Sequence, residues 1–176
     1  MTALAQVYTD IMNKVVSILS GGVRVFNTVA VYNDQITRMK NGSGTTYWLP
    51  AVFIELRTYN ENTIGDQLTN ADIDVIFHVA HMELDSGIGT LDQNLNIFTM
   101  RDYVKSTFSM FKPTNCGLFV WKGEQQQFNH DNINEYKLTY KCHYIDNVAN
   151  SLITGTQYEY ANAGITFSFG YSQSVG

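Results

Sequence analysis

The sequence predicts an α+β fold: an antiparallel or mixed sheet of about five strands, two helices packed on one face, and an extended C-terminal arm. Two stretches repeat apolar residues at helical spacing, several shorter ones alternate apolar and polar residues, and the composition changes after residue 146. We therefore expect a single domain over residues 1–146 and an arm over residues 147–176.

The first helix is expected between Leu4 and Leu19. Its apolar residues recur at spacings of four and three and form one stripe, namely Leu4, Tyr8, Ile11, Val15 and Ile18. Gly21 and Gly22 are expected to end the helix, because glycine accepts the left-handed conformation found at helix C-termini. Residues 23–29 then have the pattern of a first strand.

Two further strands are predicted in the middle of the chain. Pro50 precedes an apolar run over residues 51–57, and residues 72–80 alternate, with one face formed by Ile73, Val75, Phe77 and Val79. Residues 32–48 are rich in turn formers, and we expect a loop with at most one helical turn. Residues 59–70 are polar and predict a long exposed loop.

A second helix is predicted over residues 91–111, with Pro113 stopping it. One apolar stripe contains Ile97, Met100, Val104, Phe108 and Phe111, and a separate patch contains Leu91, Leu95 and Phe98. One sheet cannot cover both surfaces, and oligomers commonly bury such an excess. We therefore expect the patch to make subunit contacts. The alternative is that a kink or the arm covers it within the monomer.

The domain is expected to close with a hairpin of residues 117–127 and 134–146. Its second strand alternates polar or charged residues with an apolar set: Tyr136, Leu138, Tyr140, Cys142 and Tyr144. Such regular alternation is typical of a sheet with one face in water, which favours antiparallel pairing.

The arm contains a single charged side chain, Glu159, and includes a strand-like alternation of Ile165, Phe167, Phe169 and Tyr171. Burying these four side chains gains about 1.5–3 kcal/mol each, whereas ordering the seven residues costs about 1–2 kcal/mol apiece. Because the two sums nearly cancel, we expect the arm to order only where it also gains sheet hydrogen bonds, for example by adding a strand to a neighbouring subunit. These four residues are further candidates for the subunit interface.

Composition and charge argue against several classes of function. The chain has 176 residues, of which 44% are hydrophobic and only two are proline, as expected of a globular protein. Its net charge of −5 and the lack of a Lys/Arg run argue against tight nucleic-acid binding. Without a signal sequence or a membrane-length apolar run, we expect a soluble protein made in a cytoplasm. Cys116 and Cys142 are expected to be ordinary reduced thiols.

No arrangement of residues in the sequence predicts catalysis. His78 and His81 lie near several carboxylates, but strand residues three apart face opposite ways, which favours solvent-facing polar side chains over a shared metal ion. Cys142 and His143 also face opposite ways, as strand neighbours. The sequence contains no phosphate loop, dinucleotide-binding glycine pattern, nucleophile elbow or metal-ligand spacing. We expect a protein that is not an enzyme, with no catalytic residue, cofactor or metal.

An N-terminal amphipathic helix, Pro50 leading into the strand 51–55, the alternating strand 73–79, a helix, and a hairpin ending in residues 136–144 follow one another in the chain. This order of elements, over residues 3–146, resembles that of the phage tail-terminator proteins of the minor tail protein U type.

The resemblance implies a virion structural protein that forms a homo-oligomeric ring, expected to be a hexamer, at the tail and neck. Such a ring ends tail-tube polymerisation and joins the tail to the head connector. Its partners would be its own copies, the tail-tube protein and head–tail connector proteins, with DNA passing through the lumen without specific binding. The ring would be assembled in the host cytoplasm and would have no membrane partner.

Two other classes of function are open at this point. Another self-assembling neck or tail-tube protein would bind its own kind end to end. A ligand-binding domain or enzyme would need a deep pocket lined by Tyr136, Tyr140 and the sheet face that contains His78.

Overall fold

The computed structural model describes residues 3–40, 47–64, 68–82, 91–127 and 133–146. In chain order the elements are α1 (Ala3–Val16), β1 (Leu19–Ser20), β2 (Val23–Arg24), β3 (Thr28–Val31), α2 (Gln35–Lys40), β4 (Ala51–Ile64), β5 (Leu68–Met82), α3 (Leu91–Phe108), β6 (Val120–Gln127) and β7 (Ile133–Asp146). They form an α+β fold with a mixed five-stranded sheet, which confirms the predicted fold class. The predicted arm lies outside the described residues.

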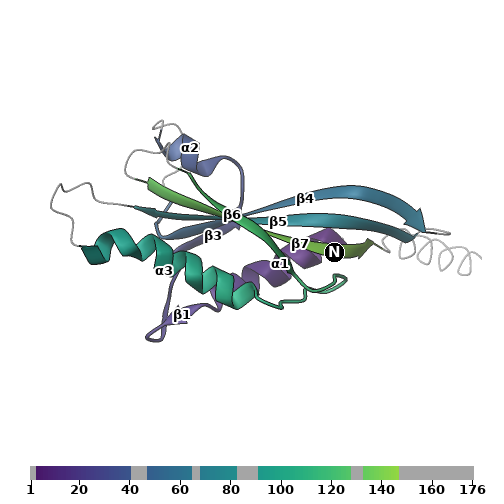
Figure 1. Ribbon diagram of the computed structural model, residues 1–176, viewed down its shortest axis with the longest axis horizontal. Helices are drawn as coiled ribbons and strands as arrows, with labels where there is room; N and C mark the ends of the chain where they lie inside the picture. Colours follow the sequence, from purple (N-terminus) through teal and green to yellow (C-terminus); the bar gives the residue numbers. More distant parts are fainter. Residues whose placement is uncertain (1–2, 41–46, 65–67, 83–90, 128–132, 147–176) are drawn as a thin grey trace, which may run out of the picture.

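The strand order in the sheet is β3-β4-β5-β7-β6. β3 runs parallel to β4, whereas the other three pairs of neighbours are antiparallel. Figure 1 shows the long strands β4, β5 and β7 running side by side along the length of the molecule. β6 and β3 are therefore the two edge strands, and β1 and β2 pair in a separate small hairpin.

The main core lies between the sheet and two helices, α1 and α3. The buried residues of α1 are spaced by three or four positions, which places them on one face of the helix, and they are Ala3, Val7, Ile11 and Val15. In the same core lie Ile97, Val104 and Phe108 of α3 and the predicted apolar face of β5. Both helices thus cover one sheet face, as the sequence predicts.

A second, smaller core lies on the opposite face of the sheet, where Figure 1 shows α2. Ile36 of α2 packs there with Phe53 and Ala80, both of which are inaccessible to solvent. The prediction that this face is wet is therefore wrong at this end of the sheet, because α2 forms within the predicted loop 32–48 and covers it.

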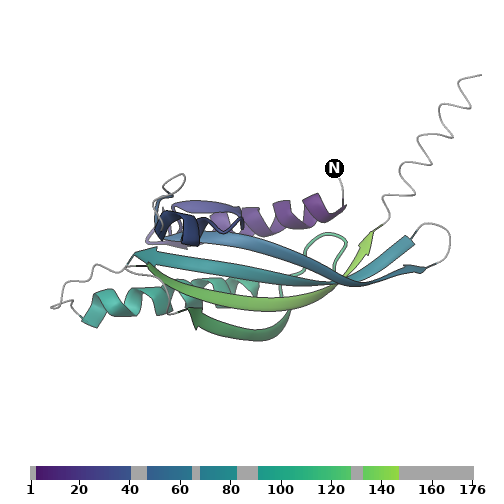
Figure 2. The same cartoon turned by 90° about the horizontal axis from the view of Figure 1, so that it is seen from above.

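The prediction of a long loop over residues 59–70 is also wrong. β4 continues to Ile64 and β5 begins at Leu68, so most of this segment extends the hairpin, as Figure 2 shows. The extension is held by backbone pairing and by polar side chains across the strands: the hydroxyl of Tyr59 donates to Asp74 Oδ1 at 2.9 Å. Its polar composition reflects the exposure of residues 60–63 and does not indicate a loop.

Two predicted boundaries also change. Val25 and Phe26 interrupt the predicted strand 23–29, because both are buried in the main core and an uninterrupted strand would point them to opposite faces. The predicted helix 91–111 ends at Phe108. There Met110 takes a left-handed conformation with φ of 63°, and the ring of Phe111 lies 5.2 Å from that of Phe108.

Asp10 connects α1 to the segment that follows α3. Its carboxylate accepts a hydrogen bond from the Thr114 N–H and another from the Gln6 side chain, each at 2.8 Å. Burial acts to raise the pKa of Asp10, but these hydrogen bonds outweigh it and hold the pKa below its usual value. The carboxylate form therefore stabilises the folded chain.

The substitution Asp10→Asn is expected to lower the free energy of unfolding by about 1 kcal/mol at neutral pH, a modest effect because the group is partly exposed. A carboxyl group with a lowered pKa stabilises the fold above its unfolded-state pKa and loses this effect as the pH falls through the folded-state pKa. The difference between the two proteins should therefore shrink below about pH 4. Urea titrations over a series of pH values measure it, and a difference that does not change with pH would contradict this account.

Candidate functional site: a polar groove and an apolar sheet edge

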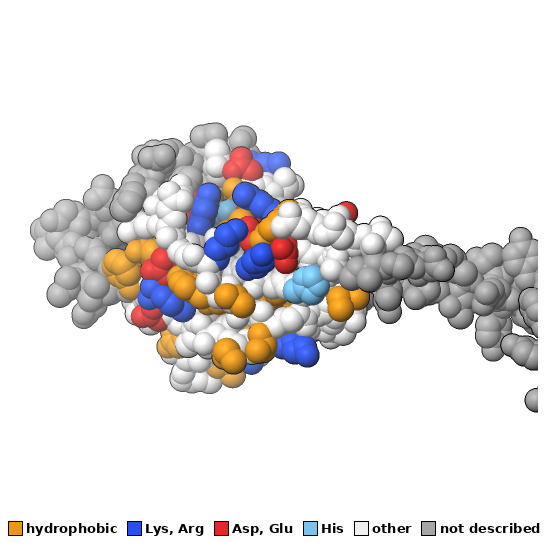
Figure 3. Space-filling view, turned by 45° about the vertical axis from the view of Figure 1, so that its right-hand side comes forward, with side chains coloured by type: hydrophobic (Ala, Val, Ile, Leu, Met, Phe, Trp, Pro, Cys, Tyr) orange, Lys and Arg blue, Asp and Glu red, His pale blue; other side chains and the backbone are white. Residues whose placement is uncertain are grey.

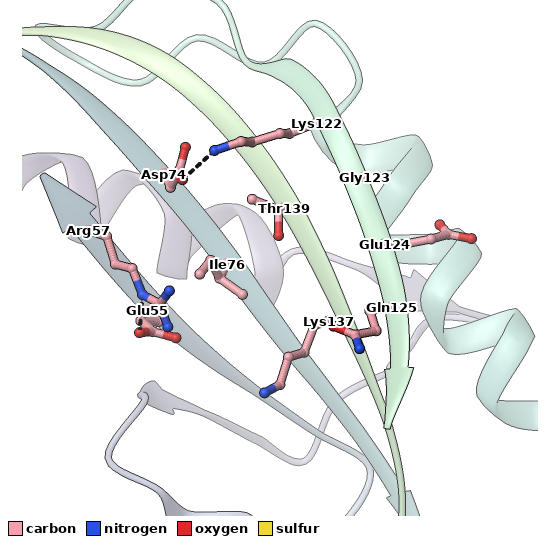
Figure 4. A pocket seen from close by; sticks show the side chains of 10 residues that line it. All are labelled: Glu55, Arg57, Asp74, Ile76, Lys122, Gly123, Glu124, Gln125, Lys137 and Thr139. Carbon is pink, nitrogen blue, oxygen red and sulfur yellow. Dashed lines mark hydrogen bonds and ion pairs between the residues drawn. The ribbon is translucent and has the colours of Figure 1, made fainter. Parts of the chain in front are cut away.

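An open groove crosses the sheet face opposite α1 and α3, and Figure 4 shows the side chains that line it from β4, β5, β6 and β7. The groove has a volume of about 470 Å³. Lys122 Nζ lies 2.7 Å from Asp74 Oδ2, and Arg57 Nε lies 2.6 Å from Glu55 Oε1. Its charges therefore neutralise one another in pairs.

The cationic groups lie outermost in these pairs. The side chain of Lys122 is 50% exposed, whereas that of its partner Asp74 is 15% exposed. The hydrogen bond with Asp74 raises the pKa of Lys122, so its ammonium group stays charged at neutral pH. Figure 3 shows Lys and Arg side chains gathered beside Asp and Glu on one part of the surface. The groove thus presents paired charges to the solvent, an arrangement suited to a polar contact surface.

His78 lies at one end of this face and is almost fully buried, with 1% exposure. Its Nδ1 is 2.7 Å from Glu135 Oε1, and its Nε2 is 2.9 Å from Glu55 Oε2. The ring of Tyr32 stacks on the imidazole at 3.7 Å between centroids. The prediction of a solvent-facing His78 is therefore wrong, because α2 and Tyr32 belong to the small core that covers this end of the sheet.

The carboxylates around His78 change the acidity of their neighbours. Burial, and next the charges of Asp34, Glu135 and Glu55, raise the pKa of Tyr32 to about 12, so the phenol stays neutral. Burial acts to raise the pKa of Glu55, but hydrogen bonds from Arg57 and His78 outweigh it and lower the pKa. The cluster therefore keeps charged carboxylates beside a neutral phenol.

The cluster has the features of a structural network. Both ring nitrogens of His78 already contact carboxylates, which leaves neither for a metal ion or a substrate. In the parts of the chain that the structure describes, no three His, Cys, Asp or Glu side chains are placed to hold a metal. Tyr136 and Tyr140 belong to the main core on the other sheet face, so they do not line a common pocket with His78. Cys116 and Cys142 are free, buried thiols whose side chains hydrogen-bond each other.

The sequence does indicate that one end of the polar sheet face is buried, although the alternation of residues 72–80 does not show it. Residues 51–54 are apolar at every position, and Ala80 adds a small apolar residue on the same side as Phe53. A run that is apolar on both faces is typical of a strand covered on both sides.

Four exposed apolar side chains lie beside the outer edge of β6. We call this surface the β6-edge patch and define it as Met110, Leu118, Val120 and Trp121, with exposed fractions of 70%, 45%, 62% and 38%. A hollow of about 340 Å³ beside it is lined mainly by Met110, Val120, Trp121, Phe119 and Tyr140. Exposed aromatic and aliphatic side chains around a hollow are typical of a protein contact site.

A second apolar hollow lies at the other edge of the sheet, between α1 and the strands β3 and β4. Its volume is about 400 Å³, and its lining includes Leu4, Tyr8, Val31 and Leu56. Val31 is the most exposed of these four side chains, at 56%, and the other three are half-buried. This hollow is a second apolar surface that is open to a partner.

The predicted interface residues are only partly placed by the structure. Phe98 on α3 is 43% exposed, and its ring lies 5.7 Å from that of Tyr136. The side chains of Leu91 and Leu95 lie outside the described part, as do Ile165, Phe167, Phe169 and Tyr171. Sequence reasoning missed the β6-edge patch, although residues 118–121 are apolar at four successive positions that lead into the edge strand β6.

Among the described helices, none combines the length and the apolar character that crossing a membrane requires. The sequence matches no protein-family model, and a search of curated proteins also finds no match.

Proposed function

We propose that this chain is a virion structural protein, not an enzyme, whose copies join into a closed ring at the tail and neck of a phage. The observation that carries the proposal is the β6-edge patch, an exposed apolar surface beside an edge strand with no described partner strand on its outer side. The order of helices and strands, which is the basis of the resemblance to tail terminators, supports the same role.

In this role the ring ends the growth of the tail tube and offers a surface to the head connector. The paired charges of the polar groove suit either contact, because they provide directional recognition without attracting DNA strongly. The His78 cluster stiffens the end of the sheet that borders the groove.

The test is the assembly state of the full chain at micromolar concentration, measured by light scattering and by electron microscopy. Closed rings with an opening wide enough for double-stranded DNA are expected. The substitution Met110→Asp should reduce the assembly to monomers that keep the circular dichroism spectrum of the wild type, because Met110 lines the hollow and is 70% exposed. Leu19→Asp is the matched control, since Leu19 is 54% exposed but lies in the separate β1–β2 hairpin.

A wild-type chain that stays monomeric, or a Met110→Asp chain that still forms rings, would contradict the proposal. Open-ended tubes would favour the alternative, a tail-tube subunit that stacks end to end.

A further inference from the structure

We propose that residues 165–171 of one copy add a strand to the outer edge of β6 in a neighbouring copy. This inference rests on the proposed function and names the contact through which the copies join.

The acceptor is the free backbone edge of β6. β6 pairs with β7 from Val120 opposite Lys141 to Gln127 opposite Glu135, and it is the last strand in the order of the sheet. No other described strand lies on its outer side. An edge strand directs alternate N–H and C=O groups outward, and an extended peptide can pair with them.

One face of the sheet at the β6 edge is apolar and the other is polar, and the donor segment also has one apolar and one polar side. On one side Met110 and Trp121 line the apolar hollow, and on the other Lys122 and Gln125 line the polar groove. Residues 165–171 alternate in the same way, with Ile165, Phe167, Phe169 and Tyr171 separated by Thr166, Ser168 and Gly170. A strand paired with β6 places its apolar row over the hollow and continues the polar face with the other row.

The hollow suits the aromatic rings of the donor. Its lining includes Phe119, Trp121 and Tyr140, and the ring of Trp121 lies 5.1 Å from that of Tyr140 in an edge-to-face contact. Phe167 and Phe169 can extend this arrangement, since aromatic side chains favour edge-to-face and offset contacts with one another.

The length of chain between β7 and the donor indicates a neighbouring copy. β7 leaves the sheet beside the segment that leads into β6, where the N–H of Gly117 donates to the carbonyl of His143 at 2.7 Å. A strand added to β6 of the same copy would need a short connection, because most connections in compact domains have about 2–6 residues. Residues 147–164 instead separate β7 from the donor, and a spacer of this length reaches about 60 Å when extended.

Donor and acceptor are different surfaces of the same chain, so each copy gives a strand to one neighbour and accepts a strand from the other. Contacts of this head-to-tail type generate rings when the rotation between copies closes. The inference therefore explains how one kind of contact produces the proposed ring.

The experiment compares full-length variants by light scattering and by hydrogen exchange of the β6 amides. Phe167→Asp combined with Phe169→Asp disables the donor, and Met110→Asp, in the lining of the hollow, disables the acceptor. Each variant alone should be monomeric, with faster exchange in β6 than in the wild-type assembly. Ser168→Asp is the control, because it adds a charge to the polar side of the donor segment, and this variant should still assemble.

A mixture of the donor-disabled and the acceptor-disabled variants tests whether the contact between copies is head-to-tail. The Met110→Asp copy keeps its donor and the doubly substituted copy keeps its acceptor, so the mixture should form a complex of one copy of each. A mixture that stays monomeric overturns the inference. Rings that persist with Phe167→Asp and Phe169→Asp also overturn it, but leave the proposed function standing. A wild-type monomer whose β6 exchange quickens on these two substitutions shows that the segment binds its own copy, which overturns both.

Discussion

Replacing Phe108 by alanine is expected to lower the free energy of unfolding by about 3–5 kcal/mol, the range typical of a buried aromatic residue. Phe108 is fully buried where α3 meets the sheet, and its ring centroid lies 4.4 Å from that of Phe77 and 5.9 Å from that of Phe119. The substitution therefore leaves a cavity that rigid neighbours on several sides cannot fill. Urea denaturation followed by circular dichroism measures the loss.

Phe98→Ala is the matched control on the same helix. Phe98 is 43% exposed and makes one ring contact in the described structure, with Tyr136, so its loss should be less than half that of Phe108→Ala. Equal losses for the two variants would show that α3 does not pack against the sheet through the Phe108 face.

His78→Leu is expected to lower the free energy of unfolding by about 1–3 kcal/mol at neutral pH, because it removes a buried side chain that contacts two carboxylates. The change takes a hydrogen-bond partner from Glu55 and from Glu135, and the side chain of Glu135 is only 4% exposed. Without the imidazole, the carboxylate of Glu135 still has Lys137 Nζ at 3.9 Å but loses its shortest contact in a region of low polarity. Thermal and urea unfolding at constant pH measure the effect.

His143→Leu provides the control on the neighbouring strand, where the side chain is 53% exposed and 3.6 Å from Asp72. Its effect should stay within about 0.5 kcal/mol. Combining His78→Leu with Glu135→Gln should recover part of the loss, since the buried charge is then gone. A double variant no more stable than His78→Leu would show that the loss arises from packing against Tyr32 and not from the charge.

The parts of the fold that depend on one buried face could be predicted from the sequence. The alternation in residues 72–80 and 136–144 places the right residues in the main core, and the periodicity of α1 does the same. In each case one face of the element is buried, so apolar residues recur in the sequence at the spacing of a helix or a strand.

The parts that depend on tertiary context could not be predicted in the same way. Residues 59–63 of the β4–β5 hairpin are polar at successive positions, so their pairing leaves no hydrophobic repeat, and Asn60 and Asp72 meet only after the strands align, at 3.2 Å. The burial of His78 depends on α2 and Tyr32, which are distant from it in sequence. The β6-edge patch is recognisable only once the strand order makes β6 an edge.

The position of β7 has a consequence for synthesis of the chain. β7 pairs with β5 on one side and β6 on the other, although α3 separates it from β5 in sequence. Pairing between segments so far apart slows folding, because a long loop must close first. As the chain leaves the ribosome, the hairpin of β4 and β5 must wait for residues 133–146 before its neighbour in the sheet exists. The nascent chain therefore passes through a stage in which an unpaired strand edge is open to aggregation, and a chaperone that shields β5 during this stage would raise the yield of folded protein.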